Sequence, residues 1–307
     1  MPRFINGWIL DGQYRQLSKQ TLILRRTYCE RLSWWLNREG HEECGAPQIK
    51  GFLCYVTTGH TEPGGRYGIA GLTKPVRSRT VKDTHGILRS FFLWMVAEGY
   101  VDESPMASVK APIHRADQIQ PFTEDQINGL LRAAKASRHP KRDEALITFM
   151  LDTGVRASEL CNLCFDDLDI VSRKAIVLGK GNKHRAIYFG RETGRLVWQY
   201  IRAQAIEGKS PLFVREKGSA FTRNGLGQLL QRLGAVARIE ATRCSPHTLR
   251  HTFAEMFLRG GGSVFTLKEM LGHTDLAMTS RYVALAQADV QDQHRQFSPV
   301  ERLRGRK

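Results

Sequence analysis

The sequence predicts a mainly α-helical protein with one small β-hairpin, divided into two domains. Three observations predict this. Apolar residues recur at helical spacing along most of the 307 residues. One region, 168–189, changes to the alternation that is typical of strands. The stretch from Pro105 to Gln120 has no periodicity and contains Pro112, so it separates two groups of helices.

The first group contains four expected helices and a long loop. The helices are expected at residues 4–11, from Ser18 or Thr21 to about 38, at 47–56 and at 78–98. Glycine and proline punctuate residues 57–77, which therefore read as a loop. The aromatic pairs Trp34–Trp35 and Phe91–Phe92 are assigned to the core rather than to base stacking.

The second group begins at Thr123, where Thr123 and Gln126 form a capping-box pattern. Expected helices follow Thr123 and continue at 141–151, through Glu159 to 163, at 191–205 and at 223–236. Strands at 175–178 and 186–189 flank the turn Gly179-Lys180-Gly181-Asn182-Lys183, which predicts a hairpin.

The last part of the chain holds three short adjacent elements. A helix that starts near His247 is expected to end at the glycine run 260–262, and a short apolar segment covers 264–271. Thr274 or Asp275 is expected to cap a final helix that carries Tyr282. The polar tail from about residue 286 is either a partner-binding arm or a disordered end.

The charge balance points to a polyanionic partner. The formal net charge is +16, which favours nucleic acid ahead of an acidic membrane surface. A solvated basic surface without a ligand is the alternative.

The six cysteines are expected to be reduced thiols in a cytoplasmic protein. The chain start has no long apolar segment of a signal peptide, and no run approaches the roughly 18 apolar residues of a membrane span. Cys161-x-x-Cys164 is a weak zinc pattern because no second ligand pair follows at finger spacing, so no metal site is predicted.

Chemistry-bearing side chains gather in the last third of the chain. His247 and Arg250 are three residues apart, so a helix places them on one face. His273 and Tyr282 follow on the next two elements. Cationic groups around a phenol suit an attack on an anion, and phosphate is the evident candidate.

Four motifs in order resemble the tyrosine recombinases, also called the phage integrase family, and its Xer-like branch. They are Thr153-Gly154-Val155-Arg156-Ala157-Ser158-Glu159-Leu160, Gly179-Lys180-Gly181-Asn182-Lys183, His247-Thr248-Leu249-Arg250-His251-Thr252-Phe253, and Leu271-Gly272-His273 with Tyr282 nine residues on. Each motif alone is weak, since such residues are usually core or surface positions. The specificity comes from their occurrence in this order and at this spacing.

The resemblance implies a two-domain, C-shaped clamp on DNA. Residues 1–112 would be a helical, SAM-like core-binding domain, and 113–120 a linker. Residues 121–285 would be the catalytic domain, and 286–307 a tail that contacts another protomer. The arm-binding module of some integrases is expected to be absent.

The resemblance also implies a role for each site residue. Tyr282 would attack a scissile phosphate and form a 3′-phosphotyrosyl bond, which conserves the energy of the phosphodiester, so no cofactor is expected. Arg156, Arg250 and His273 would stabilise the phosphorane, and Lys180 would protonate the leaving 5′-oxygen. His247 would act as acid or base, Glu159 would hold the Arg156 guanidinium, and His251 would be structural.

Basic residues outside the catalytic set are candidate DNA contacts. Lys74, Arg77, Arg79 and Lys82 surround the expected start of the fourth helix, which suits a DNA backbone. Lys183, His184 and Arg185 on the hairpin are either phosphate contacts or solvated residues.

The expected partner is double-stranded DNA with specific recombination sites. The resemblance implies a homotetramer on two sites, or a heterotetramer with a related recombinase, and no membrane. Two other functions remain alternatives: a type IB topoisomerase-like enzyme, and a catalytically silent DNA-binding regulator on the same scaffold.

Overall fold

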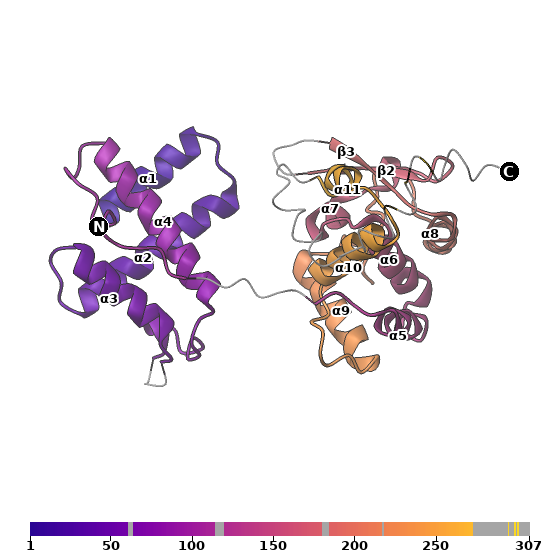
Figure 1. Cartoon of the computed structure of the whole chain (residues 1–307), viewed down its shortest axis with the longest axis horizontal. Helices are drawn as coiled ribbons and strands as arrows, with labels where there is room; N and C mark the ends of the chain where they lie inside the picture. The colour runs from indigo at the N-terminus through magenta and orange to yellow at the C-terminus, as the bar shows by residue number, and fades with distance from the viewer. Residues whose placement is uncertain are drawn as a thin grey trace. The chain divides into compact units, whose positions relative to one another are not determined.

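The computed structural model describes residues 1–60, 64–113, 120–179, 184–216 and 218–272, together with His294, Ser298 and Val300. The chain divides into two compact units, Met1–Asp117 and Gln118–Lys307, and the division falls within the segment that was expected to be a linker. Figure 1 shows that the first unit is helical and that the second combines helices with a small sheet.

The first unit contains the four helices that the sequence predicts. They are α1 (Pro2–Tyr14), α2 (Lys19–Arg38), α3 (Ala46–Thr57) and α4 (Ser78–Ala97). The Ser18 hydroxyl accepts a hydrogen bond from the Thr21 N–H, which satisfies a free donor at the start of α2. The apolar faces of the helices meet in an aromatic core that buries Trp35, Phe91 and Phe92, as expected for these pairs, while Trp34 packs at its border.

The loop before α4 is more ordered than its composition suggests. It contains a short 3-10 turn, η1 (Arg66–Gly68), and the Arg66 side chain is buried. Arg66 Nη2 donates to the carbonyls of Thr58 (2.9 Å) and Lys74 (2.6 Å), so one guanidinium joins the two ends of the loop. Tyr67 packs edge-on against Trp34, and burial raises the pKa of Tyr67 to about 12.

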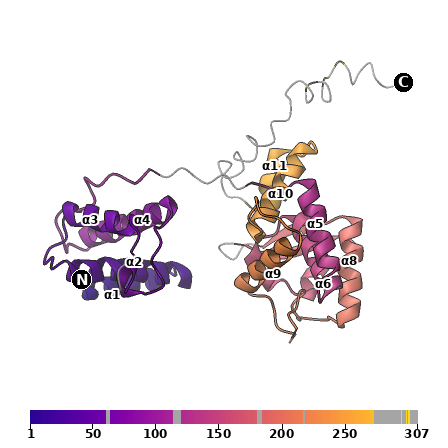
Figure 2. The ribbon, with the colours of Figure 1, turned by 90° about the horizontal axis from the view of Figure 1, so that it is seen from below.

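The second unit surrounds a central helix. Its described helices are α5 (Glu124–Lys135), α6 (Pro140–Thr153), α7 (Ala157–Asn162), α8 (Arg191–Gln204), α9 (Arg223–Val236), α10 (Pro246–Arg259) and α11 (Val264–Leu271), with a 3-10 turn η2 (Phe165–Asp167). Helix α6 packs against α5, α8 and α10, and Figure 2 shows α5, α6 and α8 side by side. Thr123 and Gln126 form the predicted capping box at the start of α5.

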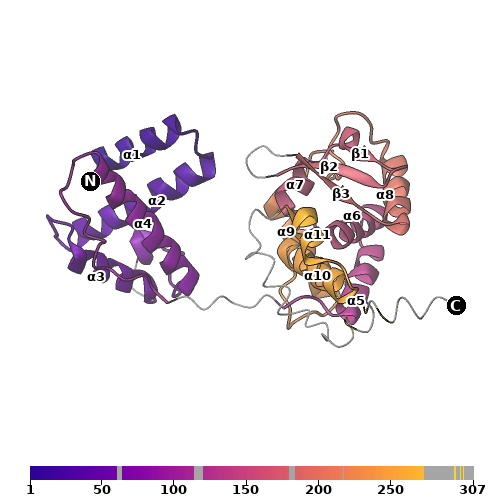
Figure 3. The same cartoon turned by 45° about the horizontal axis from the view of Figure 1, so that its top comes forward.

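The sheet has three antiparallel strands in the order β1-β2-β3 (Figure 3). These are β1 (Leu168–Asp169), β2 (Lys174–Leu178) and β3 (His184–Tyr188). The register of β2 and β3 runs from Lys174 opposite Tyr188 to Leu178 opposite His184. The predicted hairpin is therefore present, and β1 is an additional strand. Helix α7 packs against β2, and α11 packs against β3.

The chain enters the second unit through a buried contact. Phe122 lies in the core, and its N–H donates to Thr252 Oγ1 of α10 at 2.9 Å. None of the helices in the described residues has the length and apolar composition needed to cross a membrane. The final helix expected around Tyr282 and the polar tail lie outside the continuous described ranges.

Candidate active site

The site is built on the turn between α6 and α7. Helix α6 ends at Gly154 with φ of 59°, a left-handed conformation that glycine adopts at low cost. A β-carbon at this position would lie 2.3 Å from Phe253 Cδ1, so α10 packs directly against the turn. The close approach fixes the position of the backbone from Gly154 to Arg156.

Arg156 precedes α7 and is held by the first turn of that helix. Its N–H donates to Glu159 Oε2 at 2.8 Å, and its Nη1 donates to Glu159 Oε1 at 2.8 Å. Its Nη2 donates to the Gly272 carbonyl at 2.9 Å. The Arg156 side chain is 31% exposed, so part of the guanidinium faces solvent. The two contacts with Glu159 fix the orientation of the guanidinium plane. Glu159 was predicted to hold the Arg156 guanidinium, and these are the contacts that such a role would use.

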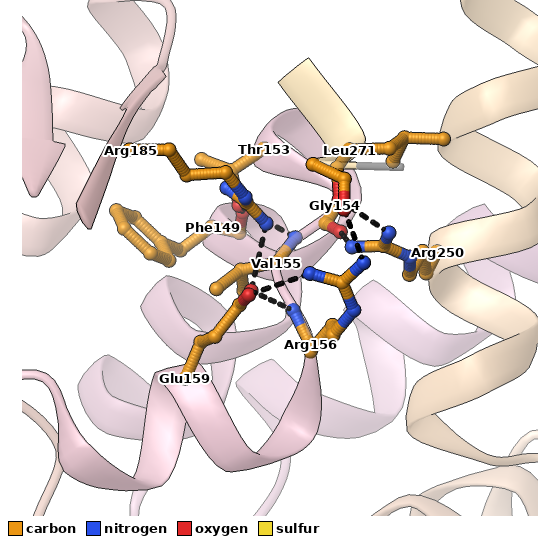
Figure 4. Close-up of polar contacts among 10 residues, drawn as sticks. Phe149, Thr153, Gly154, Val155, Arg156, Glu159, Arg185, Arg250 and Leu271 are labelled. Atoms are coloured by element: carbon orange, nitrogen blue, oxygen red, sulfur yellow. Dashed lines mark hydrogen bonds and ion pairs between the residues drawn. The ribbon is translucent and has the colours of Figure 1, made fainter. Parts of the chain in front are cut away.

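Arg250 lies on α10 and is almost completely buried, with 4% of its surface exposed. Its Nη1 donates to the Gly154 carbonyl and its Nη2 to the Leu271 carbonyl, both at 2.7 Å. Figure 4 shows these contacts around the α6–α7 turn. The side chain therefore joins this turn to the end of α11.

The two guanidinium groups meet at the end of α11. Arg250 and Arg156 donate to the adjacent carbonyls of Leu271 and Gly272. Arg250 also contacts Gly154, two residues before Arg156. Two planar, permanently charged forks thus converge at one place, as the recognition of phosphate oxygens requires.

Arg185 on β3 is a third guanidinium in this group (Figure 4). Its Nη2 donates to Glu159 Oε2 at 2.7 Å, and its side chain is only 13% exposed. Burial lowers the pKa of Arg185, the Glu159 carboxylate opposes this shift, and the nearby Arg156 charge adds to it. The side chain is therefore not a solvated hairpin residue.

His247 lies in the first turn of α10 and is exposed. Its Nε2 is 3.2 Å from His251 Nε2, and the two rings meet edge-on. His251 thus contacts a side chain of its own helix, in line with the structural role expected for it. The contact restricts the orientation of the His247 ring.

Four candidate DNA contacts lie at the start of α4 in the first unit. Lys74, Arg77, Arg79 and Lys82 are all exposed there. Arg79 Nε is 2.9 Å from Asp83 Oδ1, so its charge is partly compensated. The position at a helix N-terminus favours an anion, because N–H groups and the helix dipole both point outward there.

The remaining predicted site residues lie outside the described residues. These are Lys180, Lys183, His273 and Tyr282. The described residues contain no group of three or more His, Cys, Asp or Glu side chains able to hold a metal ion. Cys161 and Cys164 are free thiols, and burial raises the pKa of each.

The Arg185–Glu159 pair is the part of the site that sequence reasoning missed. A signal for it was present in the alternation of β3. Arg185, Ile187 and Phe189 lie at every second position, and Ile187 and Phe189 are buried. A charged residue in phase with buried neighbours predicts a buried partner.

Comparisons with known proteins agree with this geometry. The Phage integrase family matches residues 120–289, which is more than half of the chain. Tyrosine recombinase XerC of Alcanivorax borkumensis is 30% identical over 213 residues, which cover 67% of this chain and 69% of that protein. Tyrosine recombinase XerD of Listeria innocua is 29% identical over 219 residues, which cover 69% of this chain and 73% of that protein.

A solved structure shares the fold. The structure of the Tn1549 transposon integrase in complex with transposon right end DNA superposes with a TM-score of 0.71. The match covers 96% of this chain and 99% of that chain at 19% sequence identity.

Proposed function

Since the chain belongs to the phage integrase family and is a site-specific tyrosine recombinase acting on DNA, we propose that it cleaves and rejoins strands through a covalent bond to Tyr282. The Tyr282 oxygen attacks the scissile phosphorus, and the bond from phosphorus to the 5′-oxygen breaks. The product is a 3′-phosphotyrosyl bond and a free 5′-hydroxyl. The 5′-hydroxyl of the partner duplex then attacks the phosphotyrosyl phosphorus, which releases Tyr282 and joins the two strands. This exchange of strands forms a Holliday junction.

The convergence of Arg156 and Arg250 is the observation that carries this proposal. Both bind the adjacent carbonyls at the end of α11, so their positions are set before DNA arrives. Among the described residues, Arg156 Nε has no hydrogen-bond partner, and the side chain remains partly exposed. That exposed edge provides donors for the non-bridging oxygens as charge develops in the phosphorane.

The proton transfers use three further residues. His247 accepts the proton of the attacking phenol and returns it during resealing. Lys180 donates a proton to the leaving 5′-oxygen, and His273 donates a hydrogen bond to a non-bridging oxygen. The phosphotyrosyl bond retains the free energy of the phosphodiester, so resealing proceeds without a cofactor.

The first unit contributes affinity for the DNA backbone. Lys74, Arg77, Arg79 and Lys82 are proposed to contact phosphates near the α4 N-terminus. The logarithm of the DNA-binding constant falls linearly as the logarithm of the salt concentration rises. Removing one such phosphate interaction should make this negative slope shallower by about 0.9. On two recombination sites the active assembly is a homotetramer, or a heterotetramer with a related recombinase. The proposed location is the cytoplasm.

A suicide substrate tests the chemistry. It carries a nick close to the scissile phosphate, so that a short fragment leaves and the covalent adduct accumulates. The native chain should form an adduct that survives denaturation, and Tyr282→Phe should form none. Tyr188→Phe is the matched control, since Tyr188 is an exposed tyrosine of the same unit. Adduct formation by Tyr282→Phe would remove Tyr282 as the nucleophile.

A further inference from the structure

Arg185 occupies an unusual position for a basic residue. It is the second residue of β3, and only His184 separates it from the predicted turn that carries Lys180. Alternation along the strand places it on the same face as Ile187, which is 1% exposed. An arginine in this row is directed toward the interior of the unit and must find a partner there.

The partner is the carboxylate that also orients Arg156. The Glu159 side chain is 1% exposed and accepts from Arg156 N, Arg156 Nη1 and Arg185 Nη2 at 2.7–2.8 Å. Charge-assisted hydrogen bonds of this length are strong and directional. One buried carboxylate therefore holds both the Arg156 guanidinium, just before α7, and the Arg185 guanidinium on β3.

The C-terminal end of α11 also packs against Arg156 and Arg185. Gly272 ends α11 with φ of 61°, and a β-carbon there would lie 2.6 Å from Arg185 Nε and 3.5 Å from Arg156 Nη1. The end of α11 thus packs on both guanidinium groups. Residue 272 directly precedes His273 in the sequence.

We propose that Arg185 is a positioning residue for strand cleavage, which aligns the hairpin carrying Lys180 with the Arg156 fork through their shared carboxylate, Glu159. The inference rests on the proposed function, because it assumes that Lys180 protonates the leaving oxygen. It assigns Arg185 to the alignment of the general acid. The residue acts through other groups and does not itself touch the reacting atoms.

The burial of Arg185 argues against a simple phosphate contact. Its Nε and Nη1 atoms are buried and have no hydrogen-bond partner among the described residues. Donors enclosed in this way do not reach the backbone of a duplex unless the side chain moves out. Moving it out would leave the Glu159 carboxylate with one guanidinium in place of two.

A substrate with a 5′-bridging phosphorothiolate shows whether a variant is slow because its general acid is misaligned or for another reason. In this substrate sulfur replaces the leaving oxygen, so cleavage breaks a P–S bond and releases a thiolate. A thiolate leaves without a proton, because a thiol is far more acidic than an alcohol. Cleavage of this substrate therefore does not require the general acid.

On the ordinary site, Arg185→Gln should slow single-turnover cleavage about 10- to 100-fold, because it disturbs but does not remove a general acid, whose full contribution is typically about 10²- to 10⁴-fold. DNA affinity should stay within about twofold, as expected for a residue without a phosphate contact. On the phosphorothiolate, Arg185→Gln and Lys180→Ala should both cleave at the native rate. Arg185→Lys, which keeps a charge near Glu159, should retain more activity on the ordinary site than Arg185→Gln. The melting temperature of each variant shows that the unit is folded.

Lys174→Gln is the matched control. Lys174 is a basic residue of the neighbouring strand whose side chain is 45% exposed, so its replacement should leave cleavage of both substrates unchanged.

The outcomes separate the inference from the function on which it rests. Rescue of Lys180→Ala without rescue of Arg185→Gln overturns the role of Arg185 and leaves the general acid in place. Failure of Lys180→Ala to recover overturns Lys180 as the acid, and with it the alignment by Arg185. A weaker affinity with an unchanged cleavage rate makes Arg185 a DNA contact. Normal cleavage by Arg185→Gln overturns the inference directly.

Discussion

Each unit of the molecule contains an arginine that is buried and bonded to main-chain carbonyls, yet the two side chains serve different ends. Arg66 in the first unit is 3% exposed, and Arg250 in the second is 4% exposed. Arg66 joins Thr58 and Lys74, the two ends of a single loop. Arg250 joins Gly154 and Leu271, which belong to separate elements.

The difference shows that burial and carbonyl bonding alone do not identify a functional arginine. What distinguishes Arg250 is that its partners belong to the two segments that also hold Arg156. Its hydrogen bonds therefore assemble a group of cations, whereas those of Arg66 close a loop against aromatic rings. A pair of arginine substitutions, one in each unit, tests this distinction. A glycine pair then compares the packing of the two units, and a tyrosine pair tests the aromatic core of the first unit.

The largest effect is expected from replacing the two arginines by lysine. Arg250→Lys keeps the charge but loses the planar fork, so cleavage of the suicide substrate should slow at least about 100-fold. Arg66→Lys should leave the cleavage rate within about threefold and lower the stability of the first unit by about 1–3 kcal/mol, since a buried carbonyl loses its donor. The measurements are single-turnover cleavage and urea unfolding. If both variants are folded and both cleave equally slowly, Arg66 and Arg250 do not differ in their importance for cleavage.

An intermediate effect is expected at the helix-terminating glycines. Gly154→Ala places a β-carbon 2.3 Å from Phe253 in a left-handed turn, so it should destabilise the second unit by about 3 kcal/mol through strain and overpacking. Gly40 ends α2 with φ of 69°, and a β-carbon at this position would have no atom within 4 Å among its described neighbours. Gly40→Ala should therefore cost only about 1 kcal/mol of backbone strain. Thermal unfolding of both variants gives the comparison, and equal destabilisation would mean that the contact with Phe253 is not tight.

The smallest effect concerns the pH dependence of the first unit. The pKa of Tyr67 is raised to about 12 by burial, from an ordinary value of 10.0. Its neutral form therefore contributes stability that is fully present below pH 10 and is lost as the pH rises toward 12, where the unfolded chain binds fewer protons. The slope from this group cannot exceed about 1.4 kcal/mol per pH unit.

Tyr67→Phe should flatten the fall in stability over this window. The exposed Tyr14 offers the control, and Tyr14→Phe should leave the pH dependence unchanged. Urea unfolding between pH 9 and 12 supplies the data. Identical curves for Tyr67→Phe and the native chain would show that the ring is solvated.

Much of the fold could be predicted from local sequence signals. Ser18 and the Thr123–Gln126 box mark helix starts because their side chains satisfy free N–H groups of the first turn. The hairpin followed from alternation on either side of a glycine-containing turn. Strand β1 was missed because two residues are too few to show a period.

The loop before α4 and the Arg185–Glu159 pair could not be predicted from local patterns. Residues 57–77 were expected to be a plain loop, yet Arg66 is buried there and Tyr67 packs into the aromatic core. Glu159 and Arg185 are 26 residues apart and meet only because β3 returns beside α7. Such contacts depend on tertiary packing, which propensity does not encode.

The hydrogen bond from Phe122 to Thr252 has a mechanical consequence. Tension along the connecting chain enters the second unit at Phe122, whose ring is anchored in the core, and Thr252 lies on the same helix as His247 and Arg250. A pull on Phe122 would therefore load the helix that carries His247 and Arg250. An excised fragment of the second unit that starts after Phe122 would lose this anchor.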